Sequence, residues 1–346
     1  MVWEVQGHNI FLIFAVTFLV SVCLVPLVKR IAIHVGAVDI PNKRKVHSKP
    51  MPRMGGLAIF FSFLVGYLLF AVKTEQMNAI LIGAFIIVLL GILDDIKPLK
   101  ARYKFLIQLA AASVVVIYGN IYLPFISAFD IKIDFGIFGY PLAIIFILAV
   151  INAINLIDGL DGLAAGTSSI YFATISVIAF MLARIGGLET ILAILMLGAT
   201  LGFLIHNFYP AKIFMGDTGS MFLGYMIAVT ALLGFKAMTL TSLFIPILII
   251  FLPVLDTIFA IIRRTLKGKN IGSPDKEHIH HQLLKLNKSV RKTVLILYGI
   301  NILCAALSIF YALGDSQMAM FSYVALLAII LFLIFKTDVL FKRSTK

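Results

Sequence analysis

The side chains of this sequence that can do chemistry are hard oxygen ligands and cations, and they gather in a few short stretches. The carboxylates and amides are Asp94, Asp95, Asn155, Asp158, Asp161 and Asp217. Basic side chains gather in two other stretches, 43–53 and 263–281. Carboxylate and amide oxygens are ligands for Mg²⁺, and basic side chains bind phosphate. Phosphoryl transfer needs these parts, because a metal and positive groups neutralise and position charge while an acid or base acts near the attacking oxygen.

The stretch 152–162 places two amides and two carboxylates between apolar runs. Asn155, Asp158 and Asp161 are three residues apart, so on a helix they share one face. Because Asn, Asp and Gly also favour caps and turns, a helix cap followed by a turn is the alternative. Charged groups cost about 2.5–3.5 kcal/mol each at the centre of a membrane helix and far less at its end. We therefore expect this stretch at a membrane interface.

Asp94 and Asp95 close one apolar run and are followed by basic residues at 97, 100, 102 and 104. Adjacent carboxylates repel, so the pair requires a cation or basic groups nearby. The alternative is a solvated helix end that stops at Pro98. Asp217, in the stretch 216–220, either caps the next helix or holds a metal while the helix amides point at a phosphate.

The late basic loop contains His278, His280 and His281, three histidines in four residues, together with Arg264. Without a nearby Cys or a zincin pattern, this cluster suits a diphosphate better than zinc. The loop 43–56 is also basic, and its two prolines and two glycines give it a defined shape that fits a polyanion. The alternative for both loops is that their charges set topology and bind anionic lipid head groups.

The composition is that of a polytopic membrane protein. The chain of 346 residues is 61% hydrophobic with a mean hydropathy of +1.07, against roughly 45–50% apolar residues in globular domains. We expect one all-α domain over 1–346 with about eleven transmembrane helices. The expected spans are 9–28, 55–72, 78–93, 104–120, 141–157, 164–183, 189–205, 218–234, 240–262, 293–313 and 317–335. The segment 131–138 alternates apolar and polar residues and predicts a β-hairpin.

The net charge is +13. The positions of the lysines and arginines follow the expected membrane topology, so this charge does not indicate nucleic-acid binding. With alternating spans, 25 of the 29 lysines and arginines fall on the side of the first loop, and only Lys73, Lys132, Arg184 and Lys236 fall on the other. The positive-inside rule therefore predicts an outside N-terminus and a cytoplasmic C-terminus. All the polar stretches above then face the cytoplasm. Cys23 and Cys304 lie inside apolar segments and are expected to be packing residues.

Four spaced motifs make the chain resemble the polyprenyl-phosphate N-acetylhexosamine-1-phosphate transferase superfamily. The superfamily motifs are LxDD, seen here as Leu93-Asp94-Asp95, NxxNxxDGxDG at 152–162, GDxGS at 216–220 and the late His-rich loop. The form of that loop, 278–281, resembles the branch that uses UDP-GlcNAc. The resemblance implies transfer of GlcNAc-1-phosphate from UDP-GlcNAc to undecaprenyl phosphate at the cytoplasmic face of a prokaryotic plasma membrane. The products would be UMP and undecaprenyl-diphospho-GlcNAc, the start of a cell-envelope polysaccharide.

The resemblance also implies roles for single residues. Asp217 is expected to bind Mg²⁺, which Mn²⁺ can replace, with Asn155 as a second ligand. Asp94 is expected to accept a proton from the lipid phosphate, and Asp95 to support it. The expected substrate-binding residues are Asp158, Asp161, Arg264, His278, His280, His281, Lys43 and His47. Membrane lipid is the expected surrounding, and a homodimer is compatible with the sequence.

Three alternatives compete with this interpretation. A phospho-MurNAc-pentapeptide transferase of the same superfamily shares the metal chemistry, but typically has consecutive histidines in the late loop. A transporter would place its ionisable residues near the bilayer midplane, where only Asp256 is expected. A CDP-alcohol phosphatidyltransferase fails because Gly166 stands where its motif requires Arg.

Overall fold

The computed structural model describes residues 3–41, 49–128, 131–182, 187–237, 264–265 and 279–313, with a few more between 321 and 328. Its long helices are α1 (Ile10–His34), α2 (Gly56–Phe70), α3 (Glu75–Ile96), α4 (Ala101–Ser113), α5 (Gly139–Ile157), α6 (Leu163–Met181), α7 (Leu188–Asn207), α8 (Gly216–Ala237) and α12 (Val290–Leu313). A π-helical turn, Val114–Tyr118, continues α4, and the shorter helix α11 (Ile279–Asn287) precedes α12. In the described part of the chain, eight helical segments are long and apolar enough to cross a membrane.

A helix lies at each expected span as far as residue 237 and again at 293–313, in the expected order, but α2, with 15 residues, is shorter than the eight segments that could cross a membrane. The expected spans 240–262 and 317–335 lie outside the described residues, apart from a few positions in the second. The predicted bounds of the first span are wrong, because α1 continues from residue 28 through Lys29 and Arg30 to His34. Basic side chains do not end a helix by themselves, so α1 continues beyond its apolar part.

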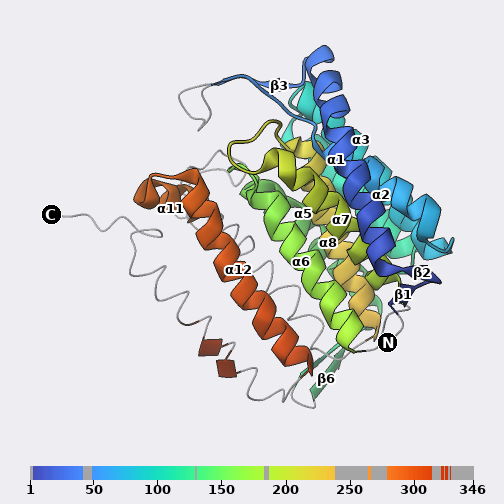
Figure 1. Cartoon of the computed structure of the whole chain (residues 1–346). Coiled ribbons are helices and arrows are strands. Elements are labelled where there is room, and N and C mark those ends of the chain that lie inside the picture. Colours follow the sequence, from blue (N-terminus) through green and yellow to red (C-terminus); the bar gives the residue numbers. More distant parts are fainter. Residues whose placement is uncertain are drawn as a thin grey trace.

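Helix α8 lies at the centre of the bundle, between α5 and α3, and also contacts α2, α6 and α7 (Figure 1). Of the residues in its 18-residue apolar stretch, 89% are buried, the highest share among the described candidate spans. The start of α8 is packed backbone to backbone against two neighbours. A Cβ on Gly56 of α2 would lie 2.1 Å from Cα of Gly219, and one on Gly91 of α3 would lie 2.3 Å from Cα of Thr218. Only glycine permits such an approach, so the first turn of α8 is held in place.

Short strands close both ends of the bundle (Figure 1). At one end β1 (Glu4–Val5) pairs with β2 (His8–Asn9), and β5 (Phe125–Ala128) pairs with β6 (Ile131–Asp134). The expected hairpin over 131–138 is therefore wrong in its bounds, because 131–134 pairs with an earlier strand and 136–138 forms a 3-10 turn. At the other end β3 (Val38–Asp39) pairs with β4 (Met51–Pro52).

The segment that follows β4 runs beside the segment that precedes α8. Gly55 N–H donates to the Phe214 carbonyl at 3.0 Å and Gly56 N–H to the Met215 carbonyl at 2.9 Å, while Phe214 N–H donates to the Pro52 carbonyl at 2.8 Å. These backbone bonds tie the end of the basic loop to the two residues before Gly216. They fix where the acidic stretch at 216–220 begins.

Candidate active site

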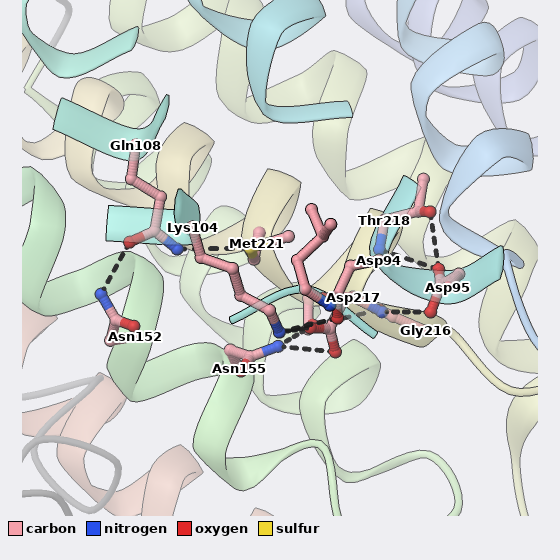
Figure 2. A network of polar contacts seen from close by, with 12 residues as sticks. Asp94, Asp95, Lys104, Gln108, Asn152, Asn155, Gly216, Asp217, Thr218 and Met221 are labelled. Carbon is pink, nitrogen blue, oxygen red and sulfur yellow. Dashed lines mark hydrogen bonds and ion pairs between the residues drawn. The ribbon is translucent and has the colours of Figure 1, made fainter. Parts of the chain in front are cut away.

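Three helices bring two carboxylates to one ammonium group. Lys104 on α4 places Nζ 2.7 Å from Oδ2 of Asp94 on α3 and 2.6 Å from Oδ2 of Asp217 on α8. Figure 2 shows the side chains of Lys104 and Asn155 converging on Asp217. The two carboxylates come from sequence positions far apart, and each alone would be costly to hold at a helix end between apolar segments. Their shared cation makes the arrangement stable and marks a position where positive charge is favoured.

Amide groups orient the remaining oxygens of the two carboxylates. Asn155 Nδ2 on α5 donates to Oδ1 of Asp217 at 3.1 Å and to Oγ of Ser220 at 2.8 Å. The backbone N–H of Leu99 donates to Oδ1 of Asp94 at 2.7 Å. Both carboxylates are thus held by a donor on one oxygen and by Lys104 on the other.

Asp95 has a different environment from its neighbour Asp94. Its side chain is buried, and its oxygens accept from Asp217 N–H at 3.0 Å, Thr218 N–H at 3.0 Å and Thr218 Oγ1 at 2.6 Å (Figure 2). Asp95 therefore caps the N-terminus of α8, where free amides favour a negative charge. The expectation that the α8 amides face a phosphate is wrong for these two, because Asp95 occupies them.

Arg53 joins the end of the basic loop to this cap. Its Nε donates to the Asp95 carbonyl at 3.0 Å and lies 3.8 Å from Oδ1 of Asp95, and its Nη1 lies 4.0 Å from Oδ1 of Asp39. The Arg53 side chain is 26% exposed, so solvent can still reach it. It places a positive charge on the surface beside the capped end of α8.

A second set of amides continues from the carboxylates along α4 and α5. Gln108, one helical turn beyond Lys104, is buried and accepts from Asn152 Nδ2 at 3.0 Å, while its own Nε2 lies 3.3 Å from the Met221 sulfur. Asn152 is exposed and also donates to the Leu148 carbonyl. Polar groups therefore continue one turn deeper than the acidic centre between these helices.

The stretch 158–162 is a turn, so the prediction that three polar side chains share one helix face is wrong. Helix α5 ends at Ile157, Asp158 is its C-cap residue, and Gly162 has a φ of +80° immediately before α6. The alternative of a cap followed by a turn is confirmed. Asn, Asp and Gly favour caps and turns, and here this preference ends the helix before the three-residue spacing can place the side chains on one helix face.

Asp161 and Asn207 connect this turn to the loop that precedes α8. Oδ2 of Asp161 accepts from Ala211 N–H at 3.0 Å. The buried Asn207 accepts from Gly162 N–H at 3.1 Å and donates to the Ile213 carbonyl at 2.9 Å. In this structure one oxygen of Asp161 is thus engaged with backbone, while its predicted substrate contact stays a prediction.

Asp158 keeps partial access to solvent but is surrounded by protein and by other acids. Burial is the largest cause that raises its pKa, to about 8, and the negative charges of Asp217, Asp95 and Asp161 raise it further. A neutral Asp158 can donate a hydrogen bond, which an ionised one cannot.

The residues at this centre fit a magnesium ion. Mg²⁺ is commonly held by one or two carboxylates together with waters and substrate phosphates, and Asp94 and Asp217 already direct oxygens at one cation. Asn155 directs its nitrogen, not its oxygen, at Asp217, so its predicted role as a ligand requires the amide to turn over. In the ranges that the structure describes, no three or more His, Cys, Asp or Glu side chains are grouped so that they could hold a metal. Water and substrate phosphate would therefore have to complete the coordination of Mg²⁺ at this centre.

Other predicted site residues are only partly placed. Lys43, His47 and His278 lie outside the described residues, and His280 and His281 belong to α11, with only their backbone described. Arg264 lies in a two-residue helical stretch and is partly buried.

Lys104 is the site residue that motif reasoning fails to single out, since four basic residues follow the acidic pair. A signal does exist, because Lys104, Gln108 and the small residues at 111 and 112 follow one helical face. That face is the one that α4 turns towards the protein.

Taken together, the apolar helices and the acidic centre at their ends define a multi-pass membrane protein with a polar site for a cation. Residues 77–235 match the model of Glycosyl transferase family 4. The chain is 47% identical to a probable undecaprenyl-phosphate N-acetylglucosaminyl 1-phosphate transferase of Bacillus subtilis, across 82% of this chain and 80% of the relative. The chain therefore belongs to this family, and the resemblance seen in the motifs is confirmed.

Relatives with lower sequence identity are also named as polyprenyl-phosphate N-acetylglucosamine phosphotransferases. A decaprenyl-phosphate N-acetylglucosaminephosphotransferase of Mycolicibacterium smegmatis is 37% identical across 85% of this chain and 80% of the relative. An undecaprenyl-phosphate alpha-N-acetylglucosaminyl 1-phosphate transferase of Escherichia coli O157:H7 is 29% identical across 81% and 78%. Each match covers most of both chains.

Proposed function

We propose that this protein transfers N-acetylglucosamine-1-phosphate from UDP-GlcNAc to undecaprenyl phosphate, giving undecaprenyl-diphospho-GlcNAc and UMP. The relatives named for this reaction support the proposal. The observation that carries it is the convergence of Asp94 and Asp217 on the Lys104 ammonium at 2.7 and 2.6 Å. Two carboxylates beside one ammonium group favour a further cation such as Mg²⁺, which would offset the charges of a lipid phosphate and a diphosphate.

In the reaction, an oxygen of the lipid phosphate forms a bond to the phosphorus that carries the sugar. The bond from that phosphorus to the bridging oxygen breaks, and UMP leaves with the electron pair. Asp94 accepts a proton when the lipid phosphate enters singly protonated, and Lys104 offsets the negative charge of the phosphoryl group during transfer. We favour this direct displacement because a phosphate oxygen is itself a nucleophile.

We further propose that the enzyme depends on Mg²⁺, with Asp217 as its ligand and Asn155 as a second. Bound there, the metal would neutralise charge on the phosphates. The capped first turn of α8 would hold Asp217 in a fixed position for this purpose.

We also propose the full topology of eleven spans, with the N-terminus outside and the active site facing the cytoplasm of a bacterial plasma membrane. The N-terminus and β6 lie at one end of the bundle, and β3 and α11 lie at the other (Figure 1). Among the described residues, the end with β3 and α11 carries the acidic centre and most of the lysines and arginines, which supports a cytoplasmic location. The product would start a lipid-linked cell-envelope polysaccharide.

The direct test supplies purified protein with undecaprenyl phosphate, Mg²⁺ and UDP-GlcNAc. We expect equal amounts of UMP and lipid-linked sugar, and little product with UDP-MurNAc-pentapeptide, because a site built for a small sugar rejects a bulky substituent. Efficient use of the pentapeptide donor would assign the chain to the other branch of the superfamily. No UMP with either donor would refute the proposal. Family membership removes the transporter hypothesis.

A further inference from the structure

Tyr298 on α12 lies against the turn that carries Asp158 and Asp161. Its hydroxyl donates to the Gly162 carbonyl, which also accepts from Gly166 N–H at 2.9 Å at the start of α6. A Cβ on Gly166 would lie 1.9 Å from the Tyr298 oxygen. The phenol therefore occupies the space that a side chain at position 166 would need.

The Gly162 peptide is held from two sides. Its N–H is bound by Asn207 from α7, and its carbonyl is bound by Tyr298 from α12. The Asn207 side is linked through Ile213 to the loop before Asp217. The same short turn thus connects the helix that carries Asp217 with α12.

Helix α12 contacts both α11 and this turn. Among the described elements, α11 packs on α12, and α12 packs mainly on α6. Deeper in that packing, Asn301 Nδ2 donates to Thr167 Oγ1 at 3.1 Å, so a second polar contact fixes the register of α12 on α6. Of these two contacts, that of Tyr298 is the nearer to α11, whose residues include His280 and His281.

We propose that Tyr298 is a positioning residue that locks α11 and α12 onto the 158–162 turn and so sets where α11, which contains His280 and His281, lies relative to Asp217. The inference rests on the proposed function, together with the sequence-based expectation that His280 and His281 bind the sugar nucleotide. Loss of the lock lowers the fraction of molecules with α11 in place, and the apparent affinity for the donor falls by that fraction. The chemistry at the carboxylates is untouched.

The kinetic test compares Tyr298→Phe with Tyr171→Phe. Tyr171, on α6, makes a similar buried bond from its hydroxyl to a backbone carbonyl, that of Ile227, away from the turn. We expect Tyr298→Phe to raise the donor KM about two- to tenfold, the effect of one lost hydrogen bond, with kcat and the Mg²⁺ dependence unchanged. Tyr171→Phe should leave the donor KM unaltered. A fall in kcat with an unaltered donor KM would overturn the proposal.

A second measurement needs no turnover. Spin labels on exposed Lys285 of α11 and exposed Lys212 before α8, with Cys23 and Cys304 replaced by alanine, report the distance between the two segments. Tyr298→Phe should broaden this distance distribution, and Tyr171→Phe should not. Equal distributions in all three proteins would refute the lock. If the unmodified protein formed no product from UDP-GlcNAc, the proposed function would fail while this measurement still decided the role of Tyr298.

Discussion

Nζ of Lys104 lies 2.6 Å from Oδ2 of Asp217, although 113 residues separate the two in the chain. The contact joins the helix that follows the acidic pair to the helix at the centre of the bundle. It places a fixed positive charge where the proposed reaction develops negative charge.

Lys104→Gln should lower kcat by roughly 10²–10³, the usual loss when one preorganised charge-stabilising group is removed. Glutamine keeps part of the stem but neither offsets phosphoryl charge nor holds the two carboxylates together. UMP release measures the effect. Lys100→Gln, at an exposed lysine one turn earlier, is the control and should retain activity. Equal losses in both variants would remove Lys104 from the centre.

Asp217→Asn should abolish turnover in a protein that remains folded and inserted. An amide keeps the shape of the side chain but loses the charge that would hold Mg²⁺. Activity over a Mg²⁺ titration is the measurement, and Asp134→Asn at the exposed end of β6 is the matched control. Near-normal rates at saturating Mg²⁺ would refute the metal role of Asp217.

Asp95→Asn should lower the thermal stability as well as the activity, unlike Asp94→Asn, which should lower activity alone. Loss of a helix cap costs about 0.5–2 kcal/mol, and the side-chain amide introduced at position 95 would direct its own N–H groups at those of Asp217 and Thr218. The melting temperature in detergent distinguishes the two variants. If Asp94→Asn proved the less stable of the two, the cap would not be the main role of Asp95.

Asp158 makes the stability of the metal-free protein depend on pH, and the raised pKa of Asp158 determines the direction of this dependence. The folded-state pKa is about 8 against 3.8 for the free side chain, so the folded state retains a proton that the unfolded state loses. The contribution of Asp158 to the free energy of unfolding is fully present below a pH of 3.8 and is lost as the pH rises from 3.8 through about 8. Without Mg²⁺, Asp158→Asn should therefore melt at a higher temperature than the unmodified protein at about pH 9, and at the same temperature near pH 4. A constant difference across this range would contradict the prediction.

Cysteine labelling tests the proposed topology. In a background without Cys23 and Cys304, a cysteine at exposed position 100 should react only with reagent on the cytoplasmic side. A cysteine at exposed position 134 should react only from outside. Reaction of both positions from the same side would refute the alternating spans.

Most of the architecture follows from hydropathy, because each apolar run must bury its backbone polar groups in its own helix. The acidic centre was predictable as a set of residue types, but not its internal contacts. Asp94 and Asp95 are chemically identical neighbours, and only the arrival of α8 makes one of them a cap and leaves the other beside Lys104. Asp161 likewise depends on a loop 50 residues away, at Ala211. Sequence spacing contains no signal for such long-range contacts.

The cap formed by Asp95 also bears on how the protein is made. Asp95 belongs to α3 and its three donors to α8, with α4, α5, α6 and α7 between them in the chain. A growing chain that has inserted α3 but not α8 therefore has a carboxylate without its native partners in a segment that will later be buried, and such groups are costly in a membrane. We therefore expect the acidic centre to be complete only after α8 has been delivered to the bilayer.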